Sequence, residues 1–198
     1  MSYNAVVIGA SAGGFYAFRK LIPKMPKDFS MPILIVQHTS PTSDNYLAQF
    51  LNKLSKLNVK EVDEKEEIKS GYVYIAPPNY HLLIEEDHTL SLSTEEKKNY
   101  SRPSIDILFE TAAIAYGKSL IGIILTGAND DGAEGLLAIQ KAGGFCIVQK
   151  PDDAEVDTMP IAAIEQAKPN KILKLDEIAK FLTKLDNPVK QKTQTKNK

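Results

Sequence analysis

The stretch Ala5-Val6-Val7-Ile8-Gly9-Ala10-Ser11-Ala12-Gly13-Gly14 joins an apolar, β-branched run directly to a glycine-rich turn. A short apolar run that ends at glycine is typical of a buried strand. Apolar residues at helical spacing follow over 15–22, and the same order returns with a strand over 33–36 and a helix over 43–56. Strand, helix, strand and helix in this order predict a parallel α/β sheet.

The middle of the chain carries a different pattern, with short strand candidates over 72–75, 81–84 and 89–93. Because turn-forming residues separate them, they predict a small antiparallel insertion over about residues 72–93. The α/β pattern then resumes with a helix over 103–116, a strand over 120–125, a helix over 132–141, a strand over 145–148 and helices over 160–167 and 176–185. The expected fold class is therefore α/β, a mostly parallel doubly wound sheet with a small antiparallel β insertion.

Length and composition predict a single folded domain, because the chain has 198 residues and a hydrophobic share of 43%. We expect this domain to cover 1–188 and a basic, disordered tail to cover 189–198. The lysines of the tail leave the rest of the chain acidic, although the net charge of the whole is only -1. An acidic body argues against a nucleic-acid partner.

The compartment is also constrained by the sequence. The single cysteine, Cys146, excludes an intramolecular disulfide and fits a reducing environment. No stretch approaches the ~20 apolar residues of a membrane span, and the first residues lack the basic region of a signal peptide. We therefore expect a cytoplasmic location without membrane insertion, and we expect neither a metal nor a cofactor.

The glycine-rich turn allows three interpretations. A dinucleotide site is disfavoured, because Ser11 stands where a second glycine would let the pyrophosphate approach, and no acid follows the second strand. A P-loop would need a Gly-Lys-Ser/Thr ending, which is missing here. The pattern G-x-S-x-G of Gly9, Ser11 and Gly13 fits a nucleophile elbow, in which a serine is exposed beside a helix N-terminus. A glycine-rich turn that only lets the helix pack remains equally open.

A nucleophilic serine needs a base, and the base needs an acid that orients it. His38 directly follows the second strand, and Asp130 and Asp131 follow the strand over 120–125. Because ligands gather at the carboxyl ends of parallel strands, these residues are expected near Ser11. Spacing alone does not choose between the two aspartates, each of which could instead cap a helix. His81 and His88 are expected to be structural or exposed.

Several motifs are dispersed along the chain. They are Val7-Ile8-Gly9-Ala10-Ser11-Ala12-Gly13-Gly14, Val36-Gln37-His38, Gly71-Tyr72-Val73-Tyr74-Ile75-Ala76-Pro77, Arg102-Pro103-Ser104-Ile105-Asp106, Leu125-Thr126-Gly127 with Asp131-Gly132, and Met159-Pro160. Together they make the chain resemble the catalytic domain of the chemotaxis protein-glutamate methylesterase family over about residues 4–167. The resemblance implies a Ser-His-Asp triad on a mostly parallel sheet and the hydrolysis of γ-glutamyl methyl esters on chemoreceptor helices. Members of the family can also deamidate selected glutamines.

The resemblance also assigns residues. It implies Ser11 as the nucleophile, His38 as the base and Asp131 as the orienting acid, since the family acid directly precedes a glycine. Backbone N–H groups at Ala12 and Gly13 are expected to bind the oxyanion. Ala12 and Ala128 stand where other members have threonine and methionine, which bears on substrate fit.

Arg102 is a further candidate for contact with the substrate, because receptor methylation helices are rich in acids.

The expected partners are methylated chemoreceptor helices and a separate receiver or methyltransferase protein. The family's usual N-terminal receiver domain has no room before residue 5, so we expect no phosphorylation control within the chain. Two other functions stay open at this point. The chain could be a binding module that docks signalling partners without turnover, or an esterase that acts on small esters outside chemotaxis.

Overall fold

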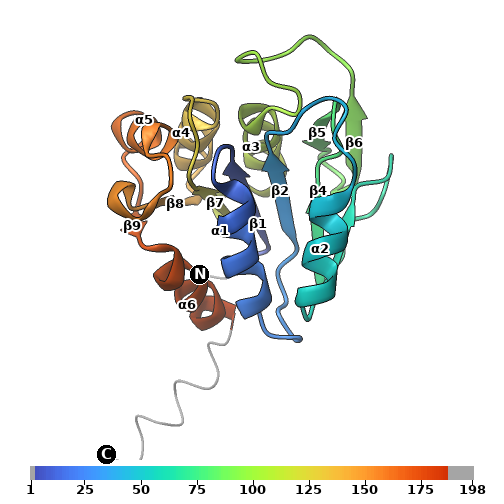
Figure 1. Ribbon diagram of the computed structural model, residues 1–198, viewed down its shortest axis with the longest axis horizontal. Helices are drawn as coiled ribbons and strands as arrows, with labels where there is room; N and C mark the ends of the chain where they lie inside the picture. The colour runs from blue at the N-terminus through green and yellow to red at the C-terminus, as the bar shows by residue number, and fades with distance from the viewer. Residues whose placement is uncertain (1–2, 187–198) are drawn as a thin grey trace, which may run out of the picture.

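A computed structural model describes residues 3–186 and contains a seven-stranded sheet with the order β3-β4-β2-β1-β7-β8-β9 (Figure 1). Every neighbouring pair in this sheet is parallel. The strands are β1 (Ala5–Ala10), β2 (Ile33–Gln37), β3 (Asn58–Glu61), β4 (Tyr72–Ile75), β7 (Leu120–Ile124), β8 (Phe145–Gln149) and β9 (Lys171–Leu173). The parallel α/β class is therefore confirmed. The expected boundary at residue 188 and the expected tail lie outside the described residues.

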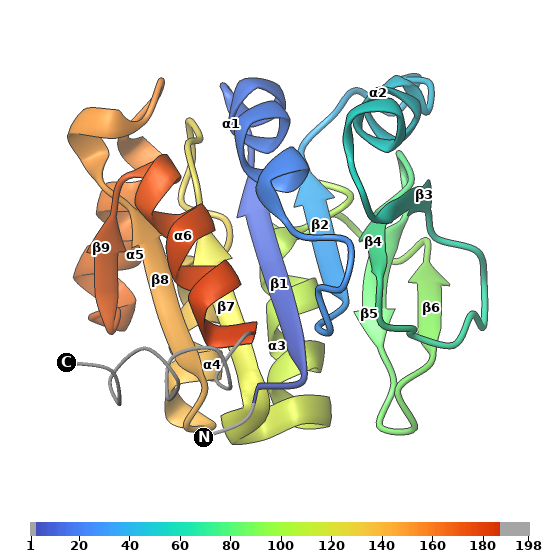
Figure 2. The ribbon, with the colours of Figure 1, turned by 90° about the horizontal axis from the view of Figure 1, so that it is seen from below.

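Helices cover both faces of the sheet (Figure 2). One face carries α1 (Gly14–Leu21), α2 (Tyr46–Leu54) and α6 (Leu175–Asp186), and the other carries α3 (Ile105–Tyr116), α4 (Ala133–Lys141) and α5 (Thr158–Ala167). Short 3₁₀ turns are η1 (Ile22–Lys24), η2 (Gly117–Ser119) and η3 (Pro151–Asp153). Between residues 3 and 186, no helix combines the length and the apolar character needed to cross a membrane.

Two hydrophobic cores follow from the alternation of side chains along the buried strands. In β1, Val6 and Ile8 belong to the core beneath α1, α2 and α6, whereas Ala5 and Val7 belong to the core beneath α3, α4 and α5. All four side chains are fully buried. A strand that is covered on both faces needs a continuous apolar run, which explains why the run at 5–8 was a reliable strand signal.

The antiparallel insertion is confirmed, but its extent is smaller than predicted. It consists of β5 (His81–Ile84) and β6 (Leu90–Ser93), which pair in antiparallel register. The prediction for residues 72–75 was wrong in this detail, because β4 pairs in parallel with β2 and β3 in the main sheet. Val73 and Tyr74 are completely buried on opposite faces of that sheet. Two-sided burial is the mark of a central parallel strand rather than of a hairpin.

The strand order creates a topological switch point at the carboxyl ends of the central strands. β1 lies between β2 and β7, and Gly9 is in register with Val36 on one side and with Ile124 on the other. The three strands therefore end together, and the loops that follow them meet there. In open α/β sheets, ligands bind in the crevice outside the carboxyl ends of the strands at such a switch point.

Candidate active site

Ser11 sits in a turn that is fixed by the two strands beside β1. Its N–H donates to the carbonyl oxygen of Thr126 at 3.0 Å, and its own carbonyl oxygen accepts a bond from Gln37 Nε2 at 2.9 Å. Thr126 Oγ1 also donates to the carbonyl oxygen of Ala12 at 2.8 Å. Hydrogen bonds to the backbone of the turn hold it from both sides, so the position of the partly exposed Ser11 side chain is well defined.

Glycines at both ends of the motif have a steric reason. Gly13 has φ +81°, the left-handed region, and forms the N-cap of α1. A Cβ at Gly9 would lie 2.3 Å from Cγ2 of Ile105 in α3.

The backbone N–H groups of Ala12 and Gly13 have no hydrogen-bond partner within residues 3–186. They are free donors at the positive end of α1, as an oxyanion site requires.

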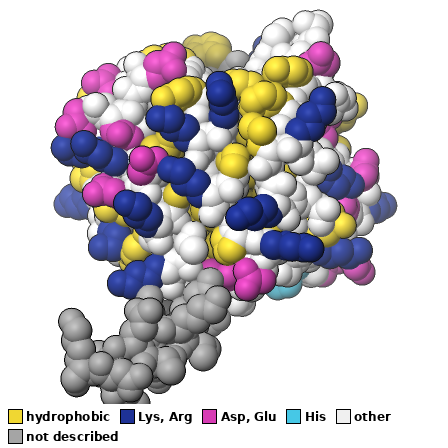
Figure 3. Space-filling model, turned by 60° about the horizontal axis from the view of Figure 1, so that its bottom comes forward, with side chains coloured by type: hydrophobic (Ala, Val, Ile, Leu, Met, Phe, Trp, Pro, Cys, Tyr) yellow, Lys and Arg dark blue, Asp and Glu magenta, His cyan; other side chains and the backbone are white. Residues whose placement is uncertain are grey.

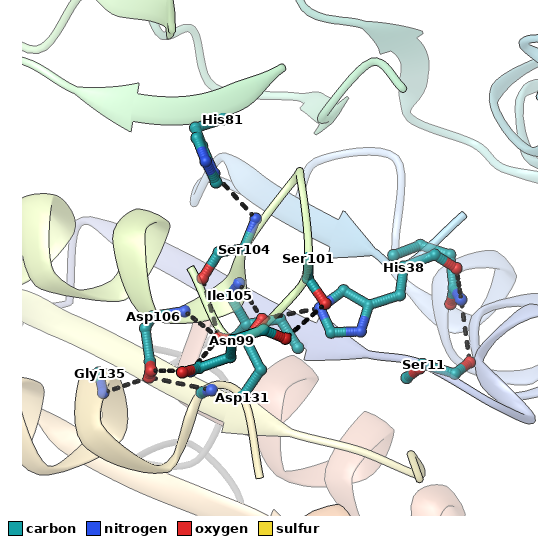
Figure 4. A network of polar contacts seen from close by, with 12 residues as sticks. Ser11, His38, His81, Asn99, Ser101, Ser104, Ile105, Asp106, Asp131 and Gly135 are labelled. Carbon is teal, nitrogen blue, oxygen red and sulfur yellow. Dashed lines mark hydrogen bonds and ion pairs between the residues drawn. The ribbon is translucent and has the colours of Figure 1, made fainter. Parts of the chain in front are cut away.

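His38 contacts the predicted acid. Its Nε2 and Asp131 Oδ2 are 2.7 Å apart, and the imidazole is 12% exposed. Because a buried carboxylate is an acceptor, the ring proton lies on Nε2 and leaves Nδ1 as the acceptor nitrogen. Figure 4 shows the imidazole between Asp131 on one side and Ser11 on the other. The carboxylate thus contacts Nε2 of the histidine, whereas the acid of the chymotrypsin triad contacts Nδ1.

Asp131 accepts hydrogen bonds on both oxygens from the start of α3. Oδ2 accepts the N–H of Ile105 at 2.7 Å in addition to His38, while Oδ1 accepts Ser104 Oγ at 2.8 Å and the N–H of Asp106 at 3.2 Å. The side chain of Ser104, the N-cap residue, is thus turned to Asp131, and the Asp131 carboxylate caps α3. The fully buried anion rests at the positive end of a helix.

These contacts decide the charge of Asp131. Burial raises the pKa of this carboxyl, but the hydrogen bonds from His38, Ile105 and Ser104 outweigh burial and leave the pKa below its ordinary value. Asp131 is therefore ionised at neutral pH and able to orient His38. Asp130 is exposed, so of the two aspartates that spacing left open only Asp131 contacts the histidine.

A second buried carboxylate, Asp106, lies beside Asp131. Burial raises its pKa from 3.8 to about 6, with a smaller contribution from the charge of Asp131, while the N–H of Gly135 opposes the shift. Between pH 4 and 6 the Asp106 carboxyl is therefore mostly protonated in the folded state and mostly ionised in the unfolded state. The stability contribution of Asp106 therefore rises as the pH falls through 6.

This predicts a pH-dependent difference between wild type and Asp106→Asn. The free energy of unfolding of the wild type, minus that of the variant, should increase as the pH falls from 7 to 4.5, because only the wild type gains the proton. Asp131 has the opposite sign, but its lowered pKa places its loss of stability below this window. Urea unfolding at the two pH values checks the prediction, which fails if the difference is constant or decreases.

The Arg102 guanidinium is held by hydrogen bonds to three other residues. It donates to the carbonyl oxygens of Thr94 and Glu95 and to Asn79 Oδ1. We call residues 94–102 the strap, since they lead from β6 to α3 past the site (Figure 1). A pocket of about 130 Å³ opens between His38 and the strap, and Arg102 and the 97%-exposed Tyr100 line it.

The remaining predicted residues are placed as follows. Ala12 and Ala128 are exposed at the same edge of the sheet. His81 is buried, bonds the carbonyl of Glu96 at 3.0 Å and accepts the N–H of Ser104 at 3.2 Å, so it supports the strap and α3. His88 is exposed in a turn. A cavity of about 350 Å³ lies on the other side of the Ser11 turn, between α1 and α6.

Comparison with known proteins settles the family. Residues 6–182 match the family model described as CheB methylesterase. The chain belongs to the CheB methylesterase family. A Leptospira interrogans relative named as a putative protein-glutamate methylesterase/protein-glutamine glutaminase is 53% identical over 186 residues, which are 94% of this chain and 96% of the relative.

More distant members of the family also match most of this chain. An Archaeoglobus fulgidus protein-glutamate methylesterase/protein-glutamine glutaminase is 36% identical, and the match covers 90% of this chain but 52% of the relative. The chain thus spans about half the length of that relative. The crystal structure of the Thermotoga maritima CheB methylesterase catalytic domain superposes with a TM-score of 0.89 at 36% identity, covering 93% of this chain and all of that domain.

Sequence reasoning missed the residues that surround the histidine and the acid. Gln37 fixes the Ser11 turn, and Asn99, Ser104 and Asp106 surround Asp131. A signal existed for two of them, because Ser104 and Asp106 lie in the first turn of the helix predicted over 103–116, near the end where short polar side chains serve as caps. Asn99 lies in a polar loop without any local pattern, so only the fold reveals its neighbours.

Proposed function

We propose that the chain is a serine esterase that hydrolyses γ-glutamyl methyl esters on chemoreceptors and releases methanol. The observation that carries the proposal is the meeting of three parts at one edge of the sheet. These are Ser11 at a helix N-terminus, the free N–H groups after it, and the bonded pair of His38 and Asp131. The same site would deamidate receptor glutamines, with ammonia as the leaving group in place of methanol.

In the first step, Ser11 Oγ attacks the ester carbonyl carbon, and its proton passes to Nδ1 of His38. Asp131 stabilises the resulting imidazolium through its bond to Nε2. The N–H groups of Ala12 and Gly13 receive the charge that develops on the carbonyl oxygen. The substrate binds so that its carbonyl reaches these donors while its methoxy group faces His38.

In the second step, the tetrahedral intermediate collapses, the C–O bond to methoxide breaks, and Nδ1 of His38 returns its proton to the leaving group. A water molecule then attacks the acyl-serine, again with His38 as the base, and the glutamate side chain and free Ser11 are restored. The cycle balances without a further reactant, because one water is consumed and one methanol is released.

The surface supports an acidic protein substrate. Lys and Arg side chains are numerous over the face that carries α1, α2 and α6 (Figure 3). Arg19 and Lys20 are exposed on α1, the helix that begins beside Ser11, and Lys53 is exposed on α2. A basic face on an otherwise acidic chain suits receptor helices rich in glutamate. The substrate would place the protein in the cytoplasm, and a separate receiver or methyltransferase protein is a further proposed partner.

The test is methanol release from a methylated receptor fragment, compared with hydrolysis of a small aryl ester. We expect turnover of the receptor fragment at a kcat/KM well above that for the aryl ester, because contacts remote from the ester contribute binding energy. Turnover of the aryl ester alone would favour an esterase outside chemotaxis. Binding of the fragment without any turnover would favour a docking module and overturn the proposal.

A further inference from the structure

Asp106 and Asn99 form a polar network behind Asp131 that the catalytic steps do not use (Figure 4). Asn99 Nδ2 donates to Asp106 Oδ2 at 2.8 Å and to Asp131 Oδ1 at 3.2 Å. Asp106 and Asp131 are both fully buried. A single amide group therefore bridges two buried carboxylates, one of which contacts the histidine.

The two carboxylates also connect the N-terminus of α3 with the N-terminus of α4. Asp131, which precedes α4, accepts the N–H groups of Ile105 and Asp106 at the start of α3. Asp106, in the first turn of α3, accepts the N–H of Gly132 at 2.9 Å and of Gly135 at 2.7 Å at the start of α4. Gly132 is the N-cap of α4 and has no side chain of its own to cap it, so Asp106 takes that place.

We propose that Asp106 and Asn99 are positioning residues, which together hold the Asp131 carboxylate in the orientation that presents Oδ2 to His38. Asp106 fixes the backbone directly after Asp131 through Gly132. Asn99 adds a hydrogen bond to the other oxygen, beside those from Ser104 Oγ and the N–H of Asp106, and so adds to the resistance against rotation of the Asp131 carboxylate. The inference rests on the proposed function, because it gives Asp131 the role of orienting acid.

A role limited to helix stability would leave the bridge unexplained. Asn99 takes a left-handed φ of 51°, an uncommon conformation for a residue other than glycine. Its amide reaches both carboxylates from that conformation. The strap on which it lies is held at one end by Arg102, and the neighbouring Lys98 bonds Glu110 of α3 at 2.6 Å. The strap is thus anchored on both sides of the residue that meets Asp131.

The test uses Asp106→Asn, which replaces an oxygen by an amide group of nearly the same size. The new amide would face either the Asn99 amide or the N–H groups of Gly132 and Gly135, so donors would meet donors. We expect kcat to fall about 10- to 100-fold with KM little changed, because misplacing a catalytic group by about 1 Å can cost about 10²-fold. The matched control is Asp130→Asn, an exposed neighbour with the same change in charge, which should keep the wild-type kcat.

Two readouts separate positioning from mere stability. The acid limb of the pH profile of kcat should move to lower pH in Asp106→Asn, because a negative charge near the His38 imidazolium is removed. The other charged groups around Asp106 are Asp131, Lys98 and Glu110, and Glu134 of α4 lies beside Lys98. The NMR resonance of the His38 ring N–H should move upfield as its bond to Asp131 loosens. Neither change is expected in Asp130→Asn.

A second variant covers the case in which Asp106→Asn does not fold. Asn99→Gly removes the bridging amide, and glycine readily adopts the left-handed φ of this position. It should lower kcat several-fold and move the same resonance. A folded variant with wild-type kcat, or with a lower kcat and an unmoved His38 resonance, overturns the inference. A wild-type protein without esterase activity, in which Asp106→Asn still moves the resonance, contradicts the proposed function and leaves the positioning role standing.

Discussion

Replacement of Ser11 by alanine is expected to lower methanol release from the methylated receptor fragment by about 10⁴-fold or more. The reason is that the variant has no oxygen to form the acyl intermediate, so only the oxyanion donors and substrate binding remain. The fold should be unaffected, because within residues 3–186 the Ser11 hydroxyl makes no hydrogen bond and the turn is held through the N–H and carbonyl groups of its backbone. Substrate binding should stay near the wild-type level.

The control for this variant is Ser70→Ala, an exposed serine in the loop before β4. It should retain full activity and the wild-type free energy of unfolding. Full activity of Ser11→Ala would show that another group is the nucleophile. Loss of activity together with loss of the folded signal would point to a structural effect, which circular dichroism and thermal unfolding of both variants distinguish.

Replacement of Asp131 by asparagine is expected to lower kcat by about 10⁴-fold, the size of effect seen when a triad acid becomes an amide. An amide NH₂ in place of Oδ2 would donate to Nε2 of His38, so that the ring proton would move to Nδ1. Nδ1 could then no longer accept the proton of Ser11. The defect lies in the tautomer, and kcat should fall far more than the affinity for substrate.

The same variant should be less stable, because both oxygens of Asp131 accept buried N–H or O–H groups. Either orientation of the amide leaves a donor facing a donor, and a buried unsatisfied polar group costs about 1–3 kcal/mol. Kinetics and urea unfolding of Asp131→Asn beside Asp130→Asn test both points. Equal activity of the two variants would remove Asp131 from the triad.

Much of this site was predictable because it depends on strand ends. The continuous apolar runs of β1, β2 and β7 identify buried parallel strands, and a parallel sheet brings the residues after them to one edge. Ser11 and His38 were placed in this way. The choice between Asp130 and Asp131 was not available from spacing, because adjacent loop residues point in different directions, and only the resemblance to a family favoured Asp131.

Other features depend on contacts between distant segments. β3 and β9 are short edge strands with mostly exposed or half-exposed residues, so they lack the apolar signal of the central strands. The substrate contact expected of Arg102 stays a prediction, and its hydrogen bonds to the carbonyl groups of its own strap have no local sequence signal. The bridge from Asn99 to Asp106 and Asp131 joins the strap, α3 and the loop before α4, and no local pattern encodes it.

Covalent labelling gives the most direct test of whether Ser11 is an activated nucleophile. The folded wild-type protein is treated with a serine-reactive fluorophosphonate, and the modified residue is located by mass spectrometry. We expect one label, on Ser11, with labelling lost in Ser11→Ala and strongly slowed in Asp131→Asn. A folded, unlabelled wild-type protein, or a label on another serine, would contradict it.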